Sequence, residues 1–201
     1  MVCHTGVGLT PMIHGTLHHF SAGGLYNGLV LLIDDETRTY WDHMTGFGLH
    51  GPLRDEQLAR WSVPLTTVAA ALEEHPDLTL FRSRLVFWKR WLTRLAPRLV
   101  RGRGWLPFFF HRTMGEKDLR RPAMDHGLGV VVGGRARYYP MASIRDPLID
   151  DWDGRPLRVH VDKKDGFPVA LWDDGTRPFQ VFTRWYGFSF TYPGCTVHTK
   201  T

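Results

Sequence analysis

The chain has 201 residues, of which 43% are apolar and 22% are charged, so it is long and apolar enough for one folded domain and is not of the disordered class. No run approaches the roughly 18 apolar residues of a membrane-spanning helix, and no secretory leader is visible. We therefore expect a single domain over residues 1–201, located in the cytoplasm or peripherally at the inner membrane face. The net charge of +5 is unevenly distributed along the chain. The segment from Arg82 to Arg121 contains twelve Lys or Arg and two acidic residues, a net charge of +10, so the remainder of the chain carries −5.

The first fifty residues favour short strands joined by turns. LYNGLVLLI is an apolar run interrupted by Asn27-Gly28, which is typical of either a tight hairpin turn or a bulge. Asp34-Asp35-Glu36-Thr37 predicts a turn, and TRTYWDHM predicts the next strand. This part of the chain is expected to be an antiparallel sheet.

Two helices are predicted in the middle of the chain. The first begins near Thr66 or Thr67, either of which can cap it, and ends before Pro76. The second covers about 83–95, where apolar residues recur at steps of three and four: Phe81, Leu85, Trp88, Leu92 and Leu95.

Strands are predicted again in the last third. HGLGVVV, the turn Gly133-Gly134 and ARYYP form a hairpin pattern, and LRVHVD, FPVALW and FQVFTRWYGFSF are expected to follow as strands. The predicted fold class is α+β, predominantly antiparallel β-sheet with two helices in the middle. We expect Trp41, Tyr138, Trp185 and Phe188 to be core residues.

Several rare-residue motifs carry a family resemblance. CHTGVGL is followed by a D-x-x-T-x-x-x-W turn, from Asp34 or Asp35 through Thr37 to Trp41, and by a T-G-x-x-x-x-G-x-L close at Thr45–Leu53. LGVVVGGRARYYP and FTRWYGFSFTYPGCTVH come later in the same order. The chain resembles the bacterial domain-of-unknown-function family 3179, which implies no established activity.

The resemblance also implies differences at the N-terminus. Family members usually carry Cys-x-x-Cys, and Cys3 resembles the second cysteine of that motif, so the chain is expected to be N-terminally short. The family is thought to consist of two related halves. Residues 82–121 look like a basic aromatic insertion within the domain.

The N-terminal residues are rich in metal-ligating side chains. Nitrogen and sulfur donors of this kind suit zinc, copper or iron, and the candidate ligands are Cys3, His14, His18, His43 and His50. No known ligand spacing is present, so surface histidines and a buried, unreactive thiol are the competing interpretations. Adjacent His18 and His19 would point to opposite faces of a strand. Whether Cys3 and Cys195 pair stays open.

The basic aromatic segment has the composition of an interfacial membrane-binding element. Its candidate membrane-binding residues are Trp88, Lys89, Arg90, Trp91, Arg94, Trp105, Phe108 and Phe109. Nucleic acid is the less favoured partner because three consecutive Phe residues fit a lipid interface better than a phosphate groove. The rival interpretation is that the rings cover the core.

Two functions therefore remain open from the sequence. One is a metal- or thiol-dependent site near the N-terminal Cys/His group, which could be catalytic. The alternative is a non-catalytic binding module attached to an anionic membrane surface. Whether the protein binds a small-molecule ligand stays unknown.

Overall fold

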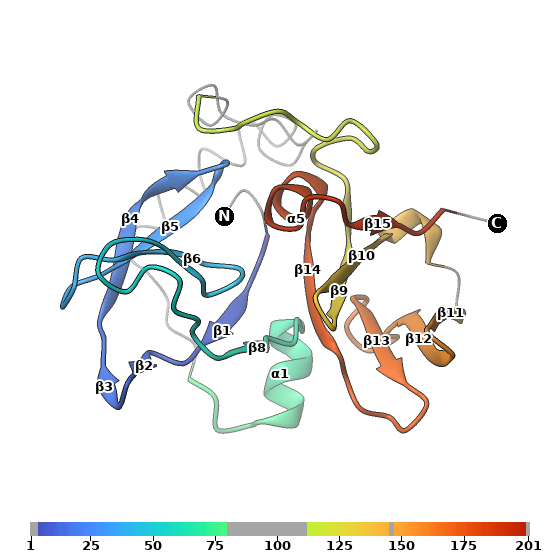
Figure 1. The fold of residues 1–201 in the computed structure, drawn as a ribbon. Coiled ribbons are helices and arrows are strands. Elements are labelled where there is room, and N and C mark those ends of the chain that lie inside the picture. Colours follow the sequence, from blue (N-terminus) through green and yellow to red (C-terminus); the bar gives the residue numbers. More distant parts are fainter. Residues whose placement is uncertain (1–3, 80–111, 145–146, 200–201) are drawn as a thin grey trace, which may run out of the picture.

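The computed structural model describes residues 4–79, 112–144 and 147–199. Antiparallel sheets with short helices dominate this part of the chain, which confirms the predicted α+β class with mostly β structure (Figure 1). None of the described helices has the length and apolar character needed to cross a membrane.

The N-terminal part is built around a four-stranded antiparallel meander. Its strands are β4 (Phe20–Tyr26), β5 (Leu29–Asp34), β6 (Tyr40–Asp42) and β7 (Gly48–His50). Asn27 and Gly28 have φ angles of 51° and 72°, so they form the tight hairpin turn, and the bulge lies between Ala22 and Gly24. Two short pairs flank the meander: β1 (Val7–Leu9) with β8 (Arg60–Ser62), and β2 (Met12–Ile13) with β3 (Thr16–Leu17).

The C-terminal part contains two further sheets. The larger has the order β14 (Phe179–Arg184), β9 (His126–Val132), β10 (Arg135–Pro140) and β15 (Thr196–Val197), with β15 parallel to β10. The predicted Gly133-Gly134 hairpin is the β9–β10 turn. The second sheet is an antiparallel meander of β11 (Leu148–Trp152), β12 (Arg155–Val161) and β13 (Pro168–Trp172). A 3-10 turn, η1 (Met141–Ser143), follows β10.

Only one of the two predicted helices lies in the described residues. Helix α1 (Val68–Glu74) is capped by the Thr67 side chain, which accepts a hydrogen bond from the Ala70 N–H. The helix predicted at 83–95 lies outside the described residues.

Helix α5 (Trp185–Thr191) corrects the expectation of a strand through Phe190. The chain turns from β14 into a helix because its first N–H groups find tertiary acceptors: Trp185 donates to the Asp125 carbonyl and Tyr186 to the Ala123 carbonyl. Trp185, Phe188 and Tyr192 recur at steps of three and four residues, and this helical spacing was the local sequence signal for α5.

The four predicted core aromatics are buried. Trp41, Tyr138, Trp185 and Phe188 are all 0% exposed, which confirms them as structural residues. Phe188 packs so closely on Gly129 that a Cβ atom there would lie 2.0 Å from the ring, so this strand position requires glycine.

The N-terminal segment is fixed against the C-terminal sheet. Thr5 is buried and its hydroxyl lies 2.6 Å from the Thr183 hydroxyl on β14. The Ser62 hydroxyl on β8 accepts a hydrogen bond from the N–H of Gln180, which is also on β14. Figure 1 shows β1 between the N-terminal meander and β14. The residues next to Thr5 are therefore held at the end of β14.

Candidate functional site

Asp34, at the end of β5, organises the family-like turn. Its carboxylate accepts hydrogen bonds from the Thr37 N–H (2.6 Å), the Thr37 hydroxyl (2.8 Å), the Thr39 N–H (3.1 Å) and the Trp41 indole N–H (2.9 Å). Asp34 is therefore the aspartate of the D-x-x-T-x-x-x-W motif. Burial raises the pKa of Asp34, but the hydrogen bonds from Trp41, Thr37 and His18 outweigh it and lower that pKa to about 2.

Two histidines and a second carboxylate complete this corner. We define the acidic corner as His18, His19, Asp34 and Glu36. His18 Nδ1 lies 3.3 Å from Asp34 Oδ1 and 3.7 Å from Glu36 Oε2, and His19 Nδ1 lies 2.6 Å from Glu36 Oε1. The expectation that His18 and His19 diverge is wrong, because neither residue is in a strand and both face Glu36.

The charges of the acidic corner reinforce one another. The Glu36 hydrogen bond raises the pKa of His19, and the same bond lowers the pKa of Glu36. His18 is only 6% exposed, whereas Glu36 and His19 reach solvent. Among the described residues, His18, Asp34 and Glu36 are the one group of three such side chains whose donor atoms all lie within 4.8 Å of one another.

A second cluster lies where the N-terminal segment meets β9 and β14. We define the basic corner as His4, Met124, His126 and Arg184. Arg184 Nε donates to His126 Nε2 (3.2 Å), Arg184 Nη1 donates to Met124 Sδ (3.4 Å), and Arg184 Nη2 lies 3.5 Å from His4 Nε2. The two histidine rings also contact each other, with 3.2 Å between His4 Nδ1 and His126 Nε2.

Electrostatics keep the basic-corner histidines neutral. Burial and the positive charge of Arg184 lower the pKa values of both His4 and His126. In residues 4–79, 112–144 and 147–199, no carboxylate forms an ion pair with Arg184. His4 also has a φ of 58°, an uncommon conformation for a residue other than glycine.

The other predicted ligands are dispersed. His14 is exposed and contacts Glu56 at 3.0 Å, and His50 lies beside the Tyr40 ring. His43 has both ring nitrogens buried with no hydrogen-bond partner among the described residues. None of the three joins His18 in the three-residue group, and Cys3 lies outside the described residues, so a site shared by Cys3 and these histidines stays a prediction. Cys195 is a buried free thiol, and burial raises its pKa.

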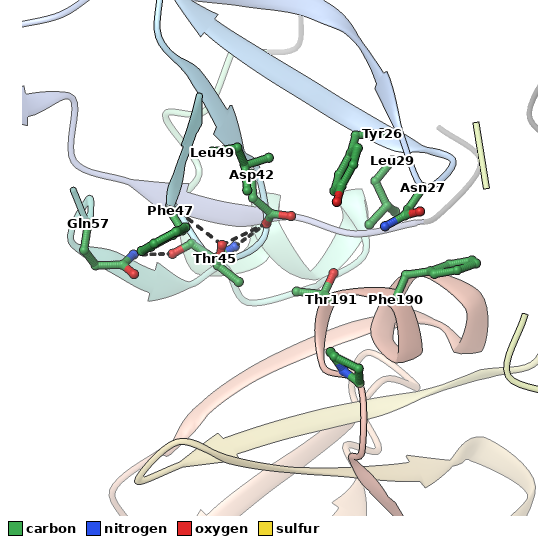
Figure 2. Close-up of a pocket in the computed structure, with 11 residues that line it drawn as sticks. Tyr26, Asn27, Leu29, Asp42, Thr45, Phe47, Leu49, Gln57, Phe190 and Thr191 are labelled. Atoms are coloured by element: carbon green, nitrogen blue, oxygen red, sulfur yellow. Dashed lines mark hydrogen bonds between the residues drawn. The ribbon is translucent and has the colours of Figure 1, made fainter. Parts of the chain in front are cut away.

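A separate cleft of about 380 Å³ opens between the N-terminal meander and α5. Figure 2 shows Tyr26 and Asn27 on one side and Phe190 and Thr191 on the other. Asp42 lies in the wall, but its carboxylate already accepts hydrogen bonds from the Met44 and Thr45 N–H groups. The cleft therefore offers rings, amides and hydroxyl groups, together with one carboxylate whose Oδ1 is held by the turn.

Sequence reasoning did not select Met124, His126 or Arg184, and it interpreted Glu36 as part of a turn rather than as a metal ligand. Glu36 had a local signal, because it lies in the predicted turn two residues after Asp34. The basic corner had none, since His126 and Arg184 are 122 and 180 positions from His4. The proposed membrane-binding residues, Trp88 to Phe109, lie outside the described part of the chain. That interpretation stays a prediction, which sedimentation with anionic liposomes at increasing salt would test.

Comparison with known proteins identifies the family. The model of a protein family of unknown function, DUF3179, matches residues 1–177, so the chain belongs to that family. The match includes the N-terminal motif and the Asp34 turn, and it ends before the aromatic stretch from Phe182. No curated protein and no solved structure matches.

Proposed function

We propose that the protein has a thiol-dependent site in which Cys3 reacts as a thiolate and the basic corner activates it. The observation that carries the proposal is the contact of Arg184 with His4, the residue next to Cys3 in the chain. A trans peptide keeps consecutive Cα atoms about 3.8 Å apart, so the anchoring of Thr5 and His4 limits how far Cys3 can lie from Arg184.

The charges of the basic corner suit a thiolate. A cysteine becomes reactive when a nearby cation lowers its pKa, and Arg184 is a permanent cation with no carboxylate ion-pair partner in the described residues. His4 and His126 have lowered pKa values, so both are neutral at neutral pH, and His4 Nε2, whose contact with Arg184 is long at 3.5 Å, can accept the thiol proton. Met124, held on the guanidinium, adds a soft, polarisable neighbour.

The reaction class that follows is attack on an electrophilic sulfur. The Cys3 thiolate attacks one sulfur of a disulfide, a new S–S bond forms, the original S–S bond breaks, and the leaving sulfur departs as a thiolate. A second thiol then resolves the mixed disulfide. The other cysteine of the chain, Cys195, is buried, so the resolving thiol comes from a second molecule such as reduced glutathione, and Cys3 leaves as a thiolate.

The test is the rate at which Cys3 forms a mixed disulfide with oxidised glutathione at pH 7, followed by peptide mass spectrometry. Arg184→Gln should slow the reaction about tenfold or more, because loss of the cation raises the thiol pKa. Arg155→Gln is the matched control, since Arg155 is an exposed arginine paired with Asp174 in the β12–β13 sheet. Equal rates in the wild type and Arg184→Gln would contradict the proposal.

A further inference from the structure

We propose that the acidic corner binds one divalent transition-metal ion of the zinc class, with His18, Asp34 and Glu36 as ligands. This site is separate from the basic corner and does not rest on the thiol function. Of its ligands only His18 was expected from the sequence; the two carboxylates come from the turn that follows β5.

The first argument is the spacing of the donor atoms. A charge-assisted hydrogen bond between imidazole and carboxylate is normally about 2.7–2.9 Å long. His18 Nδ1 instead lies 3.3 Å from Asp34 Oδ1 and 3.7 Å from Glu36 Oε2. With zinc–ligand bonds of about 2.0–2.2 Å, two ligands of a tetrahedral ion are separated by roughly 3.4 Å. The 3.3 Å contact is a long hydrogen bond in the absence of an ion, and both distances are close to the separation of two ligands of one ion.

The second argument is how the side chains are held. His18 is 94% buried on its side-chain surface, since only 6% is exposed, and Asp34 is fully buried, so neither can swing away. Glu36 Oε2 accepts the His19 backbone N–H at 2.9 Å, which fixes the carboxylate beside His18. His19 Nδ1 holds the other oxygen of Glu36. The donors are thus oriented before any ion arrives, and one side of the group is open to solvent at Glu36.

The third argument concerns the lone pairs of Asp34. A carboxylate has about four acceptor positions, and Thr37, Thr39 and Trp41 supply four donors. The Thr37 hydroxyl has an alternative partner, because it lies 2.7 Å from the Thr39 hydroxyl oxygen. Rotation of this one hydroxyl frees a lone pair of Asp34 for the ion without breaking the backbone turn. The two carboxylates supply the negative charge that a divalent cation needs.

The test is calorimetric titration of zinc into the untagged full chain after Cys3 has been blocked with iodoacetamide. One ion should bind, and Glu36→Gln should weaken binding at least about tenfold. Glu56→Gln is the matched control. Glu56 forms a similar exposed pair with His14, but it does not belong to the three-residue group.

Three results would overturn the site. The first is unchanged zinc affinity in Glu36→Gln. The second is equal loss in Glu36→Gln and Glu56→Gln, which would indicate general surface binding. The third is zinc binding that is present in the unblocked chain and lost when Cys3 is blocked, which would place the ion at the thiol instead. None of these three results depends on whether Cys3 is reactive, so the zinc proposal and the thiol proposal can fail separately.

Discussion

The acidic and basic corners use the same side chain, histidine, in opposite surroundings. In the acidic corner the carboxylate of Glu36 raises the pKa of His19, whereas in the basic corner burial and Arg184 lower those of His4 and His126. The first environment favours a cation, and the second favours neutral imidazoles and an anion such as a thiolate. A count of histidines in the sequence cannot separate these two chemistries.

The acidic corner also differs from a matching turn elsewhere in the chain. Asp34 and Asp162 each begin a turn in which the aspartate N–H donates to the carbonyl five residues later, and the residue at the fifth turn position has positive φ: Arg38 in one, Gly166 in the other. Both turns follow a tight hairpin with two positive φ angles, at Asn27-Gly28 and Asp153-Gly154.

The side chains at these two positions do different things. The Asp162 carboxylate accepts the N–H of Lys164, whereas Asp34 accepts four donors and contacts His18. The backbone turn forms in both cases, so it does not require the extra polar network around Asp34. This network is what makes the acidic corner a candidate site.

The largest expected effect is on stability. Asp34→Ala leaves the Trp41 indole N–H and two backbone N–H groups without their buried acceptor, which should cost about 3–5 kcal/mol in free energy of unfolding. Asp162→Ala removes one cap and should cost about 1 kcal/mol. Urea denaturation of both variants measures the difference. Equal losses would mean that the two turns are energetically alike.

A smaller effect isolates the indole contribution. Trp41→Phe keeps most of the buried ring but removes the N–H that Asp34 accepts, so it should cost about 1–2 kcal/mol beyond repacking. Trp172→Phe is the control in the second half of the chain, where the tryptophan is buried but contacts no buried aspartate in the described hydrogen bonds. Urea denaturation again gives the free energies of unfolding. Equal losses in Trp41→Phe and Trp172→Phe would mean that the hydrogen bond to Asp34 adds no measurable stability.

The acid limb of the stability curve should reflect Asp34. Its folded-state pKa of about 2 is below the unfolded value, so its contribution is fully present above about pH 4 and is lost as the pH falls towards 2. Asp34→Asn should flatten the decline in stability between pH 4 and 2, as measured by urea denaturation at each pH. A decline as steep as that of the wild type would assign the acid sensitivity to other carboxylates.

The smallest expected effects are the histidine titrations themselves. NMR should give a pKa above the ordinary 6.5 for His19 and below it for His126. Glu36→Gln should lower the first, and Arg184→Gln should raise the second, because each removes a charge that contributes to the shift. Shifts in the same direction at both corners would contradict the contrast between them.

Local signals account for the parts of the structure that the sequence predicted. Helix α1 has its cap at Thr67 and a proline after its end, and the β9–β10 hairpin has β-branched residues around Gly133-Gly134. Helix α5 was missed because its aromatic residues also favour strands, and tertiary contacts with the Asp125 and Ala123 carbonyls decide the outcome. The basic corner was missed because its members come together only through the packing of the N-terminal segment on β14.

The most direct test of the thiol proposal is the pKa of Cys3, obtained from the rate of iodoacetamide alkylation across pH 5 to 10 with the two cysteine peptides followed separately. An ordinary cysteine has a pKa of about 8.5. We predict that the pKa of Cys3 lies below this ordinary value and rises towards it in Arg184→Gln, while Cys195 reacts slowly throughout because it is buried. A Cys3 pKa at or above about 8.5 in the wild type, unchanged by Arg184→Gln, would contradict the account.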